Sequence, residues 1–231
     1  MGDVSRKSVA VKRRKFAREV GSVVLGVLIA LLIGEVADWV RWQIRLRDGL
    51  QAMSGELSGN RFNFVERRLE QKCIESRLIS IGKVLDRARQ TGSLPAIGTI
   101  GFPAVRPSES TAFEVAKSEG LPLHMDRQRA RDLAMLYVQM DAYNSAVSSE
   151  QNSWKTLQLL SGSERKVSDD FLIVLLQAWA NASREGVVTG VLAQQGDDNF
   201  KRFGVTADFG EFHDLAGLAK KVSERQSCQP L

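Results

Sequence analysis

The stretch SVVLGVLIALLIGEVADWVRW (residues 22–42) is the most apolar part of this 231-residue chain, and a run of lysine and arginine precedes it. Residues 20–33 carry no charge, and extension to Val40 adds only Glu35 and Asp38. A membrane-spanning helix needs about 20 mostly apolar residues. The pattern therefore predicts a basic tail over residues 1–18 and a transmembrane anchor helix over residues 19–40.

Two other interpretations of the apolar stretch stay open. A cleaved signal peptide has the same basic leader and apolar core. Its best cleavage site, after Ala37, would place Glu35 at the −3 position, where a small residue is preferred. A core helix of a soluble protein would normally show an amphipathic stripe, whereas this segment is apolar all round. An uncleaved anchor is the interpretation that the sequence favours.

The positive charge of the chain is concentrated before the apolar stretch. The net charge is +5, and residues 1–19 hold seven of the 32 basic and two of the 27 acidic residues, so the remainder is balanced. A balanced domain has no net attraction to nucleic acid. The positive-inside rule predicts a cytoplasmic tail and residues 43–231 on the far side, the periplasm of a bacterial inner membrane. The residues that set this orientation are Arg13, Arg14, Lys15 and Arg18 before the span, and the interfacial Trp39 and Trp42 after it.

Small residues recur every fourth position within the stretch, at Ser22, Gly26, Ala30 and Gly34. This spacing places four small side chains on one helix face, where a second helix can approach closely. Besides the lipid bilayer, the expected partner is a second copy of the chain or another membrane protein. Small residues are also common in membrane helices without such a role.

The N-terminal part resembles a group of uncharacterised bacterial single-pass membrane proteins. In that group a Glu precedes a GVLIAL-type core, a Trp follows, and a helical segment comes next. The matching residues are Glu19, GVLIAL at 26–31, Trp39 or Trp42, and Glu56, Leu57 and Asn60. The resemblance covers about the first 60 residues. It implies an anchored architecture with a helical extracytoplasmic domain and implies no activity.

The rest of the chain reads as helices. They are predicted over residues 43–92, from Thr111 to Gly120, and over residues 126–161, 169–194 and 208–225. Thr111 and Glu114 match a capping box, Ser168 can cap the fourth helix, and Asp208 with Glu211 the last. No segment shows the alternation typical of a strand. The fold class is therefore all-α, an N-terminal transmembrane helix followed by an antiparallel helical bundle.

Two apolar seams with steps of three and four residues support the bundle. The first comprises Ile74, Leu78, Ile81, Leu85 and Ala88. The second comprises Leu133, Leu136, Met140, Tyr143, Val147, Glu150, Trp154 and Leu157. Only Glu150 breaks the second seam. Each seam predicts a buried helix face.

Cys73 and Cys228 both follow the anchor, so both lie on the predicted oxidising side. An even pair there suggests a disulfide. Closing so long a loop would stabilise the fold by up to about 4–5 kcal/mol. Two free thiols too far apart to bond are the alternative.

Signals for chemistry are sparse. His124 and His213 are the only histidines, and neither lies in a metal-binding motif such as H-E-x-x-H. The chain has no P-loop and no G-x-G-x-x-G, so we expect no cofactor and no metal. The phenylalanines at 200, 203, 209 and 212 are expected to fill the end of the bundle. An exposed docking patch is the other option for them.

The leading functional hypothesis is a membrane-anchored helical interaction or structural component of the cell envelope, without catalysis of its own. The alternative is a small-molecule binding or sensing bundle, which a pocket beside Trp154, Trp179 or Tyr143 would support. The third is a hydrolase without a recognisable motif, which requires the two histidines and a carboxylate around one cleft.

Overall fold

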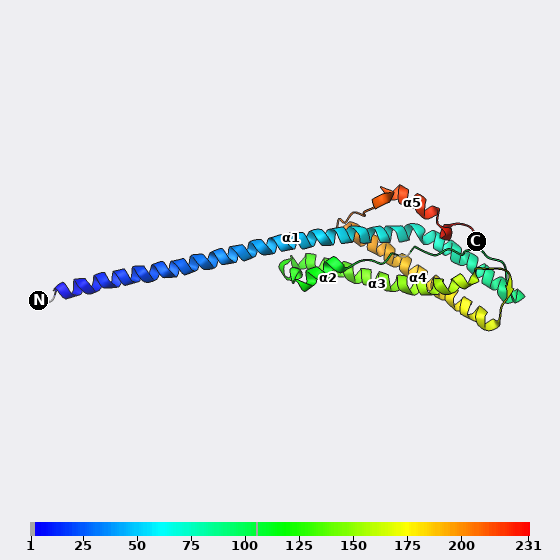
Figure 1. Cartoon of the computed structure of the whole chain (residues 1–231), viewed down its shortest axis with the longest axis horizontal. Helices are drawn as coiled ribbons and strands as arrows, with labels where there is room; N and C mark the ends of the chain where they lie inside the picture. Colours follow the sequence, from blue (N-terminus) through cyan, green and yellow to red (C-terminus); the bar gives the residue numbers. More distant parts are fainter. Residues whose placement is uncertain (1–2, 105) are drawn as a thin grey trace. The chain divides into compact units, whose positions relative to one another are not determined.

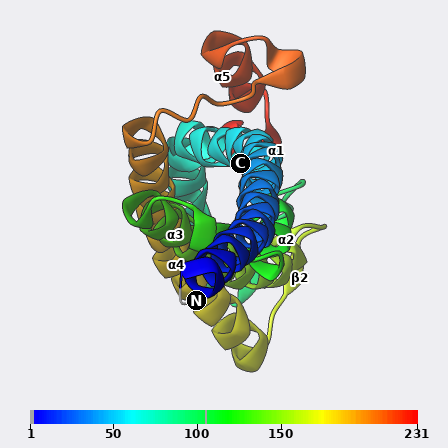
Figure 2. The same cartoon turned by 90° about the vertical axis from the view of Figure 1, so that its left-hand side faces the viewer.

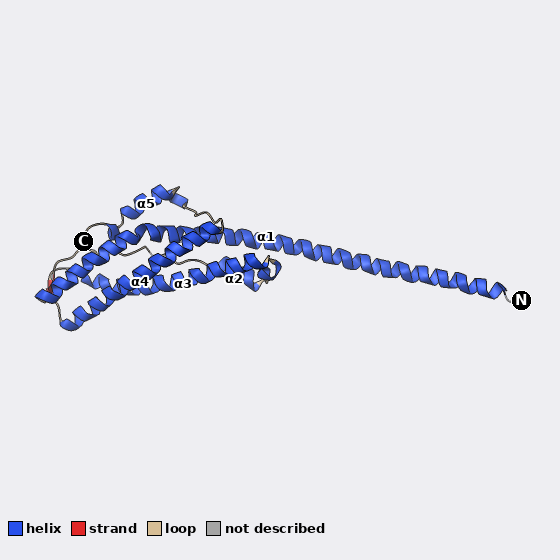
Figure 3. Cartoon of the chain, turned by 180° about the vertical axis from the view of Figure 1, so that it is seen from behind, coloured by secondary structure: helices blue, strands red, loops and turns tan. Residues whose placement is uncertain are grey.

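The computed structural model describes residues 3–104 and 106–231, and their side chains from Val20 onward. It is all-α, as predicted, and the strands of the described chain are two residues long (Figure 1, Figure 3). The α-helices are α1 (Asp3–Thr91), α2 (Thr111–Ser118), α3 (Arg127–Leu157), α4 (Asp169–Arg202) and α5 (Leu215–Ser223). The 3-10 helices are η1 (Leu121–His124), η2 (Gln158–Leu160), η3 (Gly210–Phe212) and η4 (Gln226–Cys228).

The chain divides into two units, Met1–Asp48 and Gly49–Leu231. The described residues of the first unit all belong to α1. The second unit holds the rest of α1 and every other element. The boundary lies six residues after position 43, where the sequence placed the start of the helical domain.

The C-terminal part of α1 packs against α3 and α4 through the first predicted seam. All five seam residues from Ile74 to Ala88 are buried. They meet Trp154 and Leu157 of α3 and Leu175 of α4 in one apolar cluster. Gly92 ends the helix at a φ of +68°, a conformation that favours glycine, and its N–H donates to the Ala88 carbonyl at 2.8 Å.

The second seam is also buried, and it shows the relative directions of the helices. Leu136, Met140, Tyr143 and Val147 form a cluster with Phe64 of α1 and Ala193 and Phe200 of α4. Glu56 contacts Tyr137, and Arg67 contacts Glu150, so α1 and α3 run parallel. The antiparallel packing predicted from the sequence is therefore correct for α4 against α1 and α3, whereas α1 and α3 are parallel to each other (Figure 1).

The parallel arrangement results from the segment that follows α1. Strand β1 (Ser93–Leu94) pairs with β2 (Arg165–Lys166), and Ile97 pairs with Gly162. The chain then runs back along α1: Glu70 accepts from the Ala104 N–H at 3.0 Å, and Asn60 exchanges hydrogen bonds with Glu109 at 2.7 Å. Because the chain returns in this way, α3 starts at the end of the second unit where that unit's part of α1 also starts.

Helix α5 covers a different face of α1 from α3 (Figure 2). Leu218 and Val222 of α5 pack against Phe62 and Val65 of α1. Phe62 also stacks on Phe212 with ring centroids 5.7 Å apart. The second unit of the molecule thus has a main core on one side of α1 and a smaller one on the other.

Several predicted helix ends differ from the structure. The capping box at Thr111 is wrong: Ser110 precedes α2, and the Ala112 N–H donates instead to Glu56 of α1 at 2.6 Å. Ser168 does cap α4, accepting from the Phe171 N–H at 3.3 Å. Helix α4 continues to Arg202 rather than 194, because Asp197 and Phe200 of its last turns contact α1. Asp214, not Asp208, caps α5, and Asp208 accepts from the Gly210 N–H in the preceding turn.

Candidate functional site

The apolar stretch of α1 is uncovered in the structure. An 18-residue window of this helix is long and apolar enough to cross a membrane, and none of it is buried. By length and composition alone, a soluble core helix or a signal sequence passes the same test. Leu32 and Ile33 are 64% and 65% exposed.

The small-residue face predicted within this stretch belongs to α1. Ser22, Gly26, Ala30 and Gly34 are all exposed. A Cβ at either glycine would have nothing within 4 Å. The side chains of Arg13, Arg14, Lys15 and Arg18 lie outside the described residues. Trp39 is 63% exposed, and the guanidinium of Arg45 lies 5.3 Å from the ring centroid of Trp42.

The two cysteines meet in the second unit. Cys73 of α1 and Cys228 of η4 form a disulfide with their Cα atoms 4.5 Å apart. It joins the C-terminal segment to the C-terminal part of α1, across a sequence separation of 155 residues. The pair that the sequence suggested is therefore at bonding distance, and the described chain has no free cysteine.

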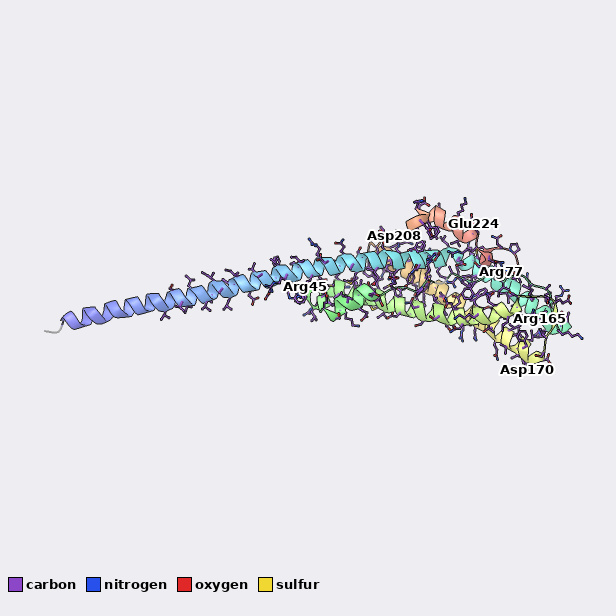
Figure 4. All side chains as sticks on the ribbon, in the orientation of Figure 1. Arg45, Arg77, Arg165, Asp170, Asp208 and Glu224 are labelled. Atoms are coloured by element: carbon purple, nitrogen blue, oxygen red, sulfur yellow. A yellow bond between two sulfur atoms is a disulfide. The ribbon has the colours of Figure 1, made fainter. Side chains whose placement is uncertain are left out.

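Buried charges hold the same C-terminal segment. Glu70 is fully buried and accepts from Arg225 at 2.9 Å and from the Ser227 hydroxyl at 2.6 Å. Arg225 also donates to Glu66, and these hydrogen bonds raise its pKa although burial alone would lower it. Arg77 donates to two carbonyls of the segment, and Figure 4 labels it on the C-terminal part of α1. We call residues 225–229 the C-terminal strap.

A further buried ion pair lies in the main core. Arg67 of α1 contacts Glu150 of α3, and it also donates to the Gly186 carbonyl of α4 at 3.2 Å. A single guanidinium thus bridges the three long helices. Sequence reasoning missed the role of Arg67, although Glu150 was visible as the one charge in an apolar seam.

The two histidines lie at or next to short 3-10 helices. His124 ends η1, and His213 follows η3 with a φ of +62°. Neither lines the pockets of about 440 and 430 Å³ in the second unit. The described residues also hold no group of three His, Cys, Asp or Glu side chains that could bind a metal.

The aromatic core leaves no room for a ligand of ordinary size. Trp154 is fully buried and Tyr143 nearly so. The pocket that Trp154 lines has a volume of about 10 Å³, at the limit of one water molecule. Among the phenylalanines, Phe200 is buried and Phe209 and Phe212 are half-buried, as expected of residues that fill the bundle, whereas Phe203 is 40% exposed.

Two larger pockets lie at the edges of the bundle. One, of about 440 Å³, has Met53, Leu57 and Leu136 in its floor and Asp126, Arg129 and Asp132 among its polar residues. The other, of about 430 Å³, lies between α1, α4 and the segment before α5. Both fall within the range of small-molecule sites, about 300–1,000 Å³.

Comparisons with known proteins leave the site as the sole guide to function. The scan against family models, the search of curated proteins and the search of solved structures each returned no significant match to this chain.

Proposed function

We propose that this protein is a single-pass membrane-anchored helical module, with its C-terminal unit on the oxidising side of a bacterial inner membrane, acting as an interaction or structural component of the envelope. The observation that carries the proposal is the uncovered apolar window of α1. Fourteen consecutive uncharged residues exposed to water would be unfavourable by about 25 cal/mol for each Å² of apolar surface. A bilayer removes that cost.

The disulfide supports the assigned side. Disulfides persist in the periplasm and are rare in the cytosol. The same position follows from the basic residues before the apolar stretch, which the positive-inside rule retains in the cytoplasm. Two independent features, one of sulfur chemistry and one of charge, therefore agree on the orientation.

Reporter fusions at the carboxyl end test the orientation. We expect an alkaline phosphatase fusion to be active, because this enzyme requires an oxidising compartment. A green fluorescent protein fusion at the same position should be dark. Replacing Arg13, Arg14, Lys15 and Arg18 with glutamine should lower phosphatase activity. The matched control replaces four exposed bases of the second unit, Lys83, Arg127, Arg131 and Arg184, and should leave activity unchanged. A fluorescent fusion in the wild type would refute the orientation.

The proposed partner surface is the small-residue face of the apolar stretch. The small side chains of this face would allow the same face of a second copy to pack closely against it. Chemical crosslinking in membranes, with a reagent that does not react with cysteine, should trap a dimer of the wild type. Gly26→Ile and Gly34→Ile should each abolish that dimer. Val24→Ile adds bulk on the opposite face and serves as the control. Equal crosslinking in all three variants would show that this face is not the contact.

A further inference from the structure

The pocket of about 430 Å³ is built from α1, α4, the segment before α5 and the first residue of α5. Polar and basic side chains form one part of its lining: Arg61, Arg68, Gln71, Gln194, Asp197 and Lys201. Apolar side chains form the other part: Val65, Leu69, Phe209 and Leu215. A site of this size with one charged wall and one apolar wall suits a small amphipathic molecule.

The charged wall carries more positive than negative charge. The carboxylate of Asp197, 1% exposed, contacts Arg61 Nε at 3.0 Å, Lys201 Nζ at 2.7 Å and Arg68 Nη1. Burial alone would raise the pKa of Asp197, but the hydrogen bonds and charges of these cations lower it, so the group is an anion. Three cations against one carboxylate leave a formal excess of two positive charges. Asp198, 3.5 Å from Lys201, offsets part of it from outside the lining.

Two of the three cations retain capacity for a ligand. Arg68 and Lys201 have side chains that are 33% and 48% exposed, against 16% for Arg61. In the described structure Arg68 donates through Nη1 alone, so Nε and Nη2 are available. A guanidinium edge of this kind matches the geometry of a carboxylate or phosphate group.

The apolar wall argues against a purely inorganic ligand. Val65 is buried, Phe209 and Leu69 are half-buried, and Leu215 is 50% exposed at the mouth. The Gln71 amide packs against Gly190, and it lies only 2.6 Å from the position that a Cβ at residue 190 would occupy. Filling this wall with hydrocarbon would contribute about 25 cal/mol per Å² that is removed from water.

We propose that this pocket binds a small amphipathic organic anion, whose carboxylate or phosphate pairs with Arg68 and Lys201 while its hydrocarbon lies against Leu69, Phe209 and Leu215. The ligand is a free metabolite-sized anion or the headgroup region of an anionic lipid, which share this chemistry. The assignment depends on the contacts of the second unit and not on the membrane anchor.

The test is isothermal titration calorimetry on the full chain in phosphatidylcholine nanodiscs, with empty nanodiscs as the blank. Hexyl phosphate should bind saturably. Inorganic phosphate should bind at least about tenfold more weakly for lack of a hydrocarbon, and hexylammonium should not bind. Absence of saturable hexyl phosphate binding, or equal binding of hexylammonium, would overturn the proposal.

Substitutions assign the binding to this pocket. Lys201→Met should weaken hexyl phosphate about tenfold, the loss expected for one charge-assisted hydrogen bond. Lys221→Met, which removes an exposed base on α5, should have no effect. Leu215→Glu places a negative charge at an exposed position of the mouth and should abolish binding. Unchanged affinity in Lys201→Met and Leu215→Glu would place the ligand elsewhere.

A second titration distinguishes the source of the ligand. Nanodiscs that contain phosphatidylglycerol should suppress hexyl phosphate binding if the headgroup of an anionic lipid occupies the pocket. Unchanged binding in those nanodiscs identifies a free anion. Both results support the pocket, since each requires the same basic wall.

Discussion

Arg67 and Glu150, each the charged interruption of an apolar seam, contact each other in the core at 2.9 Å, with side chains 2% and 4% exposed. Stepping back from Ile74 in alternating threes and fours reaches Arg67 at a seam position of α1. Glu150 holds the equivalent position of α3. Burying two charges is costly, and their mutual attraction offsets that cost only while both are present.

The cost of removing both partners should therefore be less than the sum of the costs of removing each one alone. We expect Arg67→Met or Glu150→Gln to lower the free energy of unfolding by about 3–5 kcal/mol, because each leaves a buried group without its partner. The double variant with Arg67→Met and Glu150→Met should lose less than the sum of the two single losses. Urea denaturation in mild detergent, followed by tryptophan fluorescence, measures the three values. Strict additivity would mean that the pair is not coupled.

Asp197 should make stability depend on acid pH. Its hydrogen bonds with Lys201 and Arg61 outweigh burial and lower its folded-state pKa below the ordinary 3.8. The carboxylate therefore adds stability above about pH 3.8, and that stability is lost as the pH falls through the folded-state pKa. Asp197→Asn should flatten the decline of unfolding free energy on the acid side.

The comparison for this titration is Asp198→Asn. The pKa of Asp198 is also lowered, chiefly by a hydrogen bond from Gln194, but the group is exposed. Its replacement should change the acid-side slope less than Asp197→Asn does. An equal effect of the two variants would show that burial of Asp197 contributes nothing to the slope.

Reduction of the disulfide should destabilise the second unit strongly. In the chain-entropy model, a loop of this length contributes about 4–5 kcal/mol through the unfolded state. We expect dithiothreitol, or Cys73→Ser with Cys228→Ser, to lower the urea midpoint by a corresponding amount. An alkylation gel shift reports whether the bond has been broken. An unchanged midpoint after complete reduction would show that the C-terminal strap is held by its hydrogen bonds alone.

Two glycines in helices should respond oppositely to alanine. A Cβ at Gly196 would lie 2.3 Å from the ring of the buried Phe64, so Gly196→Ala should cost about 1–3 kcal/mol by overpacking. Gly59 has nothing within 4 Å of its Cβ position, and Gly59→Ala should add about 0.5–1 kcal/mol through helix propensity. Thermal melts followed by circular dichroism give both signs. Stabilisation by Gly196→Ala would mean that α4 does not approach α1 so closely.

The apolar pattern was sufficient to predict the helices and most of the core. The residues of both seams are buried except for the half-buried Leu133, because steps of three and four keep side chains on one face of a helix. The direction of α3 was not predictable in this way. It depends on the segment after α1, whose course is fixed by single hydrogen bonds such as Glu70 to Ala104 rather than by any periodicity.

The polar contacts were the least predictable part. The last turns of α4, GDDNFKR, read as a loop because of their acids and glycine, yet Asp197 is buried by three cations that come from α1 and α4. Which of two adjacent aspartates points inward depends on the rotation of the helix against its neighbour. Arg225 and Ser227 likewise acquire partners only when the chain end returns to α1.

The bond between Cys73 and Cys228 has one more consequence, for a protease that attacks this molecule. A single cut at any site between the two cysteines opens the closed ring but releases no fragment, because each new end stays covalently tied through sulfur to the other. The nicked protein would migrate as one species until a reductant is added. Damage by proteolysis and loss of the cut piece are thus separate events, and redox conditions decide whether the second follows the first.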